Sequence, residues 1–160
     1  MAIDYFLKLD GIPGESTDAK HKGEIDVLAF SWGVSQTGSS APGGGGGAGK
    51  ALFEDLLVVA RTSKASPKLW QACASGQHVK TAVLVCRRGT GKGRVEFLKI
   101  TLEEVTVTSY EIDGSDEELP VDQIALAFGK VRTEFVSVDS KGTAQPAVTT
   151  AWDLKKNAKV

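Results

Sequence analysis

The chain places apolar side chains at every second residue in several segments, which is the period of a β-strand with one buried face. Residues 24–34 show this alternation most clearly. One set of alternate positions is bulky and apolar: Leu28, Phe30, Trp32 and Val34. The other set carries little or no side chain: Ala29, Ser31 and Gly33. A face of such small residues is expected to lie close to another surface, or to line a wall where bulk is unwelcome.

Segments of this kind follow one another along the chain and are separated by turn-forming residues. Strands are expected at residues 2–9, 24–34, 52–61, 78–88, 94–101 and 121–138, with a short edge strand at 148–154. Residues 102–112 either extend the strand at 94–101 or form a strand that follows it. Gly129 interrupts the segment 121–138, and a β-bulge is expected there. The segment 52–61 is also compatible with a helix, so both assignments stay open for it.

One helix is well marked. Ser66 is a favourable N-cap residue, Pro67 suits the first helical position, and Gly76 is the expected stop. A single short helix among seven or eight strands predicts a mainly β fold, in which two antiparallel sheets form a β-barrel or sandwich. The apolar face of the helix is expected to consist of Leu69, Trp70, Ala72 and Cys73.

The length of 160 residues favours a single domain over residues 1–160. A chain of this size buries roughly 70% of the surface that it exposes when unfolded, which is enough for a sizeable core. Residues 36–50 are rich in glycine and are expected to form an extended loop of this domain. The two cysteines, Cys73 and Cys86, are too few for a disulfide framework and are interpreted as small buried hydrophobes.

Charge is nearly balanced, with 19 basic and 20 acidic residues and a formal net charge of −1. No block of basic residues is present, so we expect no nucleic-acid partner and no attraction to an anionic membrane. No apolar run reaches the length of a membrane span, so no membrane insertion is expected. The first residues lack the basic region and uninterrupted apolar run of a secretory signal. We therefore expect a protein that folds in the cytoplasm and that, if secreted, leaves without a cleaved leader.

The glycine-rich loop contains a stretch with the spacing of a nucleotide-binding loop. Residues 44–50, GGGGAGK, match the pattern G-x-x-x-x-G-K. That motif also needs a Ser or Thr for magnesium, and Ala51 occupies this position. The segment after Lys50 is rich in Val and Leu, and the chain lacks the alternating strands and helices of a parallel sheet. We therefore expect no bound nucleotide and no other cofactor.

A structureless loop of this length is uncommon in a compact domain and is usually functional. Residues without side chains can lie flat against another surface or become ordered only on assembly. The loop is therefore a candidate interface element, through Gly43, Gly44, Gly45, Gly46, Gly47, Gly49 and Lys50.

No set of residues has the pattern of a catalytic or metal site. His21 and His78 are far apart in the sequence and are expected in surface or turn positions. The acidic residues of segment 113–122 miss the EF-hand calcium pattern, so a solvated loop is expected there. No G-x-S-x-G sequence occurs, and no serine is paired with a histidine by a known spacing. We expect neither a bound metal nor enzymatic activity.

Five blocks of the sequence occur in a distinctive order. They are YFLKLDGIPGES, HKGEIDVLAFSWGVSQ, GGGGGAGK, SKASPKLWQACASGQH and the closing WDLKKN. This combination resembles the Hcp family, the haemolysin-coregulated proteins that form the inner tube of bacterial type VI secretion systems. The resemblance extends from about residue 3 to residue 159.

The resemblance implies a β-barrel-like pair of sheets with one helix, assembled into hexameric rings with an open centre. Rings of this family stack into a tube that is capped by a VgrG-like spike protein and surrounded by sheath proteins. Contraction of the sheath expels the tube, so the subunit would be cytoplasmic during assembly and then secreted without a cleavable signal peptide. Secreted effectors would ride in the lumen, with the ring as their carrier and chaperone.

The resemblance also suggests roles for the two unusual features of the sequence. The glycine-rich loop is expected to contact an adjacent subunit or the next ring. The small-residue face, Ala29, Ser31 and Gly33, is expected to line the central channel, where a lack of bulk keeps the bore open.

Two other classes of function remain open. The strand count alone permits a monomeric β-barrel that binds a small ligand. The glycine-rich loop alone suggests a nucleotide-dependent enzyme. The number of subunits in the purified particle separates a tube subunit from a monomeric binder.

Overall fold

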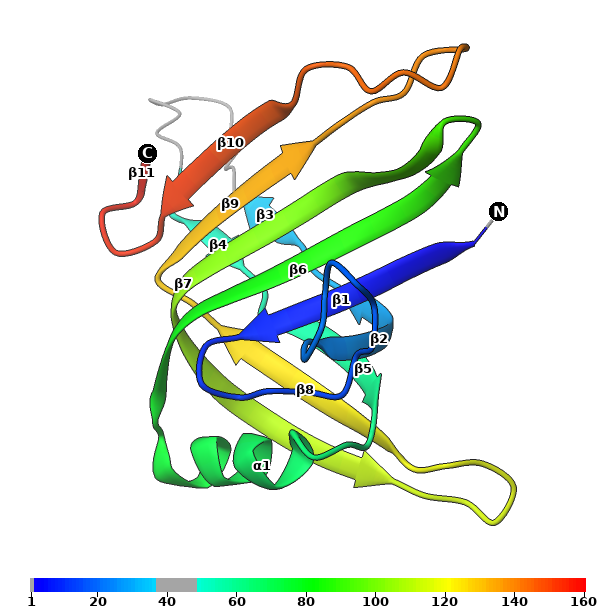
Figure 1. The fold of residues 1–160 in the computed structure, drawn as a ribbon. Helices are drawn as coiled ribbons and strands as arrows, with labels where there is room; N and C mark the ends of the chain where they lie inside the picture. Colours follow the sequence, from blue (N-terminus) through cyan, green and yellow to red (C-terminus); the bar gives the residue numbers. More distant parts are fainter. Residues whose placement is uncertain (1, 37–48) are drawn as a thin grey trace.

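The computed structural model describes residues 2–36 and 49–160 (Figure 1). Over these residues the chain forms 11 β-strands and one α-helix, α1 (Ser66–Ser75). The mainly β fold with one short helix is therefore confirmed. The strands are β1 (Ile3–Leu9), β2 (Ile25–Ser31), β3 (Val34–Gln36), β4 (Ala51–Phe53), β5 (Leu56–Arg61), β6 (His78–Thr90), β7 (Gly93–Asp113), β8 (Val121–Ala127), β9 (Lys130–Phe135), β10 (Val148–Asp153) and β11 (Ala158–Lys159).

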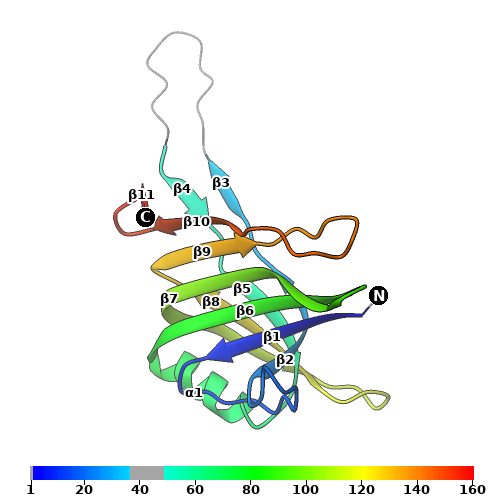
Figure 2. The same cartoon turned by 45° about the horizontal axis from the view of Figure 1, so that its top comes forward.

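Six strands close into an antiparallel barrel in the order β7-β6-β1-β2-β5-β8, because β8 pairs back onto β7. Strand β7 is 21 residues long. Its residues 106–113 pair with β8, and its residues 98–103 pair with β9. From β9 the sheet continues through β10 to β11 (Figures 1 and 2). A single long strand therefore belongs both to the barrel and to the extension β9-β10-β11.

The chain turns a corner between β8 and β9, where the sequence predicts one strand over residues 121–138. The break falls at Phe128 and Gly129, at the predicted interruption. The Gly129 amide donates to the Glu103 carbonyl at 2.9 Å, and a Cβ on residue 129 would lie 3.2 Å from the Cβ of Glu104. Glycine is needed here because two backbones approach closely at the bend.

The segment predicted as one strand over residues 52–61 forms two strands, separated by Glu54 and Asp55. Strand β4 pairs with β3 in a separate two-stranded sheet, whereas β5 pairs with β2 and β8 in the barrel. The helical alternative for this segment is wrong. Residues 102–112 extend the strand predicted at 94–101, which is one of the two alternatives left open for them, and together they form one continuous strand, β7.

A β-bulge in β2 changes the face on which its side chains lie. The register with β5 shifts between Val27 and Ala29. Val27 is buried before the bulge and Phe30 packs against the core after it, whereas Leu28 is 45% exposed. The predicted apolar face is therefore wrong for Leu28, because the extra residue of the bulge turns it outward. It is also wrong for Val34, which is exposed on β3.

The interior of the barrel is filled by apolar side chains. Burial of each large side chain contributes roughly 1.5–3 kcal/mol to folding. Helix α1 covers one end of the barrel, and its Leu69 and Ala72 belong to the same buried cluster (Figure 1). The largest fully buried barrel residues include Leu7, Leu56, Leu84, Leu102, Ile124 and Leu126.

Helix α1 begins one residue earlier than predicted. The N-cap is Ala65, so Ser66 is the first helical residue and not the cap. The Ser66 hydroxyl accepts a hydrogen bond from the Ser63 amide at 3.0 Å and donates one to buried Asp122. Because its hydroxyl bonds to Asp122, Ser66 does not cap the helix. Gly76 ends the helix with a φ of 67°, as predicted.

The segment between β1 and β2 folds back over the outer surface of the barrel (Figure 1). Backbone hydrogen bonds hold its two arms together: Gly14 donates to Gly23 at 2.8 Å, and Ser16 donates to Glu24 at 2.9 Å. A Cβ on residue 14 would lie 2.6 Å from the Glu24 carbonyl oxygen. The arms can approach this closely only because residue 14 is glycine.

We expect Gly14→Ala to lower the free energy of unfolding by roughly 1–3 kcal/mol, because the new methyl group must displace the Glu24 backbone. Gly89→Ala is the matched control, since nothing lies within 4 Å of the position that its Cβ would take. Urea unfolding of both variants and the wild type, at one protein concentration, measures the effect. Equal stability of Gly14→Ala and the wild type would contradict the close approach.

Candidate assembly surfaces

The outer face of β2, β5, β8 and β7 is a continuous surface built mainly from small and apolar side chains. The intervening residues, such as Val58 and Ile124, point into the core and are almost fully buried. The outward residues line a shallow hollow of about 280 Å³. Strand register aligns them in two rows: Ala29, Val59, Gln123 and Glu111 in one, and Ser31, Leu57, Ala125 and Ser109 in the other.

Two of the three residues predicted to share a small-residue face lie together on this surface. Ala29 and Ser31 are both exposed, in neighbouring rows. Gly33 lies beyond the end of β2 and is half-buried. Its carbonyl accepts the Glu54 amide at 3.0 Å, and a Cβ on it would lie 3.1 Å from the Glu54 carboxylate. The structure thus brings Ala29 and Ser31 together and places Gly33 apart from them.

The hairpin β3–β4 stands beside β9 and β10 and projects past them (Figure 2). Gly49 is half-buried and Lys50 is exposed, immediately before β4. Aromatic contacts anchor the base of the hairpin, because the Phe53 ring centroid lies 6.2 Å from that of Trp32 and 6.5 Å from that of Trp152. The other predicted interface residues lie outside the described residues: Gly43, Gly44, Gly45, Gly46 and Gly47.

An apolar hollow of about 390 Å³ lies between this hairpin and the strands β9 and β10. Its walls include Val34, Phe53, Val131 and Trp152. The hollow is outside the barrel, whose interior is filled by the buried leucine and isoleucine side chains. A ligand-binding barrel encloses its ligand within the ring of strands. The geometry therefore does not favour a monomeric small-ligand binder.

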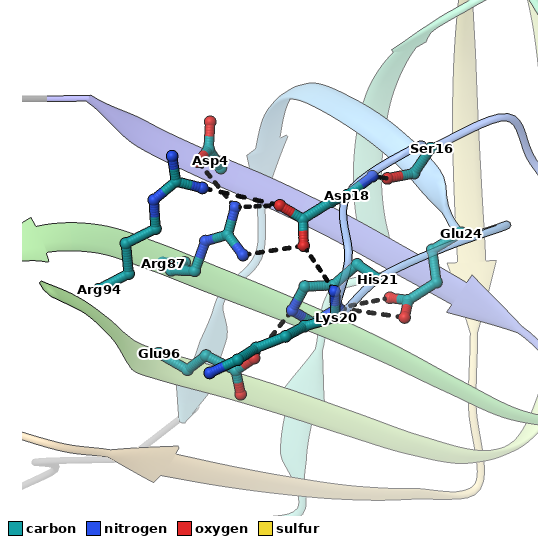
Figure 3. Close-up of polar contacts among 9 residues, drawn as sticks. All are labelled: Asp4, Ser16, Asp18, Lys20, His21, Glu24, Arg87, Arg94 and Glu96. Atoms are coloured by element: carbon teal, nitrogen blue, oxygen red, sulfur yellow. Dashed lines mark hydrogen bonds and ion pairs between the residues drawn. The ribbon is translucent and has the colours of Figure 1, made fainter.

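Figure 3 shows a cluster of charged side chains, beneath the segment between β1 and β2, that no sequence motif indicates. Arg87 on β6 is only 4% exposed. Its guanidinium donates to the two carboxylate oxygens of Asp18 at 3.0 and 2.6 Å, and to Asp4 at 3.2 Å. The hydrogen bonds with Arg87 lower the pKa of the Asp18 carboxyl and raise the pKa of the guanidinium. The cluster therefore fastens this segment to β1 and β6.

His21 lies in a turn before β2, as one of its two predicted positions required, but the surface alternative is wrong because its side chain is 6% exposed. The ring nitrogen Nδ1 lies 3.0 Å from the Glu24 carboxylate, and Nε2 lies 2.8 Å from Glu96 on β7 (Figure 3). The ring stacks on Phe6 with 4.3 Å between centroids. Local patterning gives no signal for these contacts, since Glu96 lies 75 residues away in the chain. His78 is exposed at the start of β6, as predicted.

A second buried carboxylate joins α1 to the barrel. Asp122 on β8 is 1% exposed and accepts hydrogen bonds from the hydroxyls of Thr62, Ser66 and Tyr110. Burial, together with the neighbouring carboxylate, raises the pKa of the Tyr110 hydroxyl. Three donors thus satisfy a carboxylate that forms no ion pair with any residue of 2–36 or 49–160. The prediction of a solvated acidic loop is therefore wrong for Asp122.

Both cysteines are free thiols. Cys86 on β6 is 1% exposed, and burial raises its pKa to about 11. Cys73 on α1 is half-buried and packs against the core. The interpretation as a buried hydrophobe is confirmed for Cys86 and holds in part for Cys73.

Within residues 2–36 and 49–160, no group of three or more His, Cys, Asp or Glu side chains is placed to hold a metal ion. Within the same ranges, no helix has both the length and the apolar character needed to cross a membrane. A strand, β4, follows Lys50 where a nucleotide-binding loop requires a helix. The functional hypothesis is therefore built on the outer surfaces of the barrel.

We expect Asp18→Asn to destabilise the protein near neutral pH and to have a smaller effect in acid. The lowered pKa of Asp18 in the folded state stabilises the fold fully at pH values above its ordinary 3.8; this contribution declines as the pH falls below 3.8 and is lost as the pH passes through the lower pKa of the folded state. Free energies of unfolding at about pH 7 and about pH 2.5 measure the difference. Glu118→Gln is the control, because Glu118 is exposed. A difference from wild type that stays the same at both pH values would be evidence against the pairing.

Comparisons with known sequences give a consistent result. A family model described as type VI secretion system effector, Hcp, matches residues 6–135. The Hcp1 protein of Pseudomonas aeruginosa is 40% identical to this chain over 159 residues, which covers 98% of each chain. The match therefore extends over nearly the whole of both proteins.

Solved structures agree with the sequence matches. The crystal structure of Hcp1 from Salmonella typhimurium superposes with a TM-score of 0.82 at 34% identity, and covers 100% of both chains. A structure of a type six secretion system protein reaches a TM-score of 0.92 at 33% identity, and covers 99% of this chain and 100% of that one. Sequence and fold agree over the full length, and the chain belongs to the Hcp family of type VI secretion system proteins.

Proposed function

We propose that the protein is a structural subunit of the type VI secretion inner tube. Copies assemble into hexameric rings, and the rings stack into a tube. Contraction of the sheath proteins expels this tube together with a VgrG-like spike protein. Secreted effectors travel in the lumen, with the ring as their carrier and chaperone. The subunit performs no chemical turnover, is cytoplasmic during assembly, and is then secreted through the type VI system.

The observation that carries this proposal is an outward-facing sheet of mainly small and apolar side chains on a barrel with a filled interior. Function in such a molecule belongs to its outer surface. The wall of a channel is expected to carry little bulk, and four of the eight residues in the two rows are small: Ala29, Ser31, Ser109 and Ala125. Membership of the Hcp family supports the same assignment. We assign Ala29 and Ser31 to the lumen wall, whereas the half-buried Gly33 would lie at its margin.

A closed ring requires a heterologous contact, in which one surface of each subunit meets a different surface of the next. The hairpin β3–β4 and the apolar hollow beside it are candidates for one of these surfaces, because both are open at the outside of the barrel. The glycine-rich loop that follows β3, including Lys50, is proposed to contact an adjacent subunit or the next ring.

Purified protein is expected to have a native mass of six times the subunit mass of 16.9 kDa. Native mass spectrometry measures this mass, and negative-stain micrographs should show rings with a central opening. A particle that remains monomeric at high concentration, without a visible pore, would overturn the proposal. That result would instead favour a monomeric β-barrel binder.

Ser31→Glu is expected to impair retention of effectors in the ring while leaving the hexamer intact, because it places a large charged group on the lumen wall. Ser75→Glu is the matched control, since Ser75 is exposed at the end of α1. Co-purification of a co-expressed type VI effector with the ring, together with the native mass, measures both properties. Unchanged effector binding by Ser31→Glu would show that Ser31 does not lie on that wall.

A further inference from the structure

Two exposed segments of opposite charge are not used by the proposed function. The acidic loop, residues 113–118 between β7 and β8, has four acidic residues and no basic residue. The lysine turn, residues 155–159 after β10, has three lysines and no acidic residue. Every charged side chain of both segments is exposed. Each segment therefore presents a concentrated charge of one sign to its surroundings.

The lysine turn is only partly neutralised by its own chain. Lys155 pairs with Glu104 at 2.9 Å. Within residues 2–36 and 49–160, neither Lys156 nor Lys159 forms an ion pair. Nearby Asp153 is buried and accepts a hydrogen bond from the Lys156 amide at 3.0 Å, so the fold already uses this carboxylate. Two lysine ammonium groups are thus left for a partner.

The acidic loop is even less neutralised. Asp113 accepts a hydrogen bond from the uncharged Gln123 amide at 2.7 Å. Over the described part of the chain, no basic side chain forms an ion pair with Asp116, Glu117 or Glu118. Like charges held this close repel one another unless a cation approaches from outside.

The two segments lie at opposite ends of the molecule, as both views show (Figures 1 and 2). They therefore cannot neutralise one another within one chain, whereas two copies placed end to end can bring them together. We propose that the acidic loop of one copy docks against the lysine turn of a second copy. This contact rests on the proposed function and names the surfaces through which copies meet end to end.

An apolar contact adds to the charge complementarity. Leu119 directly follows the acidic loop and is 72% exposed, which is costly for a large apolar side chain. Beside the lysine turn lies a small hollow of about 80 Å³, which Trp152 and Val160 line together with charged residues such as Lys130 and Arg132. Docking of the loop covers Leu119 against Trp152 and Val160. Exposed ion pairs contribute little affinity by themselves. The charged residues therefore determine which surface docks and in which orientation, while the apolar contact adds affinity.

The contact is heterologous, so it gives an assembly a direction. One end of any stack presents unpaired acidic loops, and the other end presents unpaired lysine turns. Each single contact is weak, but several act at once when ring-shaped particles meet face to face.

Charge reversal tests the pairing. One variant carries Asp116→Lys, Glu117→Lys and Glu118→Lys, a second carries Lys156→Glu and Lys159→Glu, and a third combines all five changes. End-to-end association is measured by sedimentation at about 50 mM salt, where screening is weak. We expect each of the first two variants to associate at least about tenfold more weakly than wild type, because like charges then face one another. The third variant is expected to recover most of the loss.

The control is Lys22→Glu with Lys68→Glu, two exposed lysines outside both segments, and it is expected to behave as wild type. Circular dichroism checks that each variant is folded. If the first two variants associate as wild type does, or if the combined variant does not recover, the proposal is overturned.

Zero-length cross-linking gives a second readout that does not depend on ring formation. Unlabelled and ¹⁵N-labelled full-length protein are mixed in urea, refolded together and treated with a carbodiimide, which couples a carboxylate directly to a lysine amine. We expect mass spectrometry to find links between the acidic loop of one copy and the lysine turn of a differently labelled copy.

The two proposals fail in distinguishable ways. Rings in native mass spectra without these cross-links overturn the end-to-end contact and leave the tube function standing; the acidic loop then serves a different partner. Cross-linked copies without rings support the contact and contradict the tube function.

Discussion

The pairing of β8 back onto β7 is the constraint on which the rest of this structure depends. It closes six strands into a barrel, and closure turns one face of every strand inward. A barrel this narrow has space only for side chains, and leucine and isoleucine fill it. Any partner must therefore contact the outer surface of the barrel, where β2, β5, β8 and β7 expose their outward side chains. Because β7 also continues into the extension, the barrel and β9 share one backbone and cannot hinge without breaking hydrogen bonds.

Two buried polar clusters attach the remaining parts to this barrel by different means. Asp122 holds α1 through uncharged hydroxyl donors, and Arg87 holds the segment between β1 and β2 through paired carboxylates. A buried polar group is costly when it lacks a partner, and these clusters satisfy the Asp122 carboxylate and both terminal nitrogens of Arg87. Among the described residues, Arg87 Nε finds no partner. Both clusters leave the sheet that carries Ala29 and Ser31 uncovered. The covering segment lies over β1 and β6, and the helix lies at one end.

The features that could be predicted from sequence are those set by neighbouring residues. Period-two alternation located most strands, and Gly76 marked the end of the helix through its left-handed conformation. The grouping of Ala29 with Ser31 also follows from alternation alone. The bulge beside Leu28 was missed because it depends on the pairing of β2 with β5. The division of residues 52–61 was missed because β4 and β5 have partners in different sheets.

The buried polar clusters could not be predicted for a related reason. Ser66 is separated by 56 residues from Asp122, and Arg87 by 69 residues from Asp18. Only the folded sheet brings such groups together, and an isolated histidine or aspartate in a sequence is typical of the surface. Gly33 fell outside the predicted face because β2 ends at Ser31, so the alternation that relates the three residues does not continue to it.

The burial of Cys86 determines how this thiol responds to oxidants. Oxidants and disulfides react with the thiolate, and a thiol with a pKa of about 11 is almost entirely protonated at neutral pH. The Cys86 thiol is therefore expected to react only slowly with oxidants and disulfides. Cys73, half-buried on α1, is the thiol that oxidants reach first.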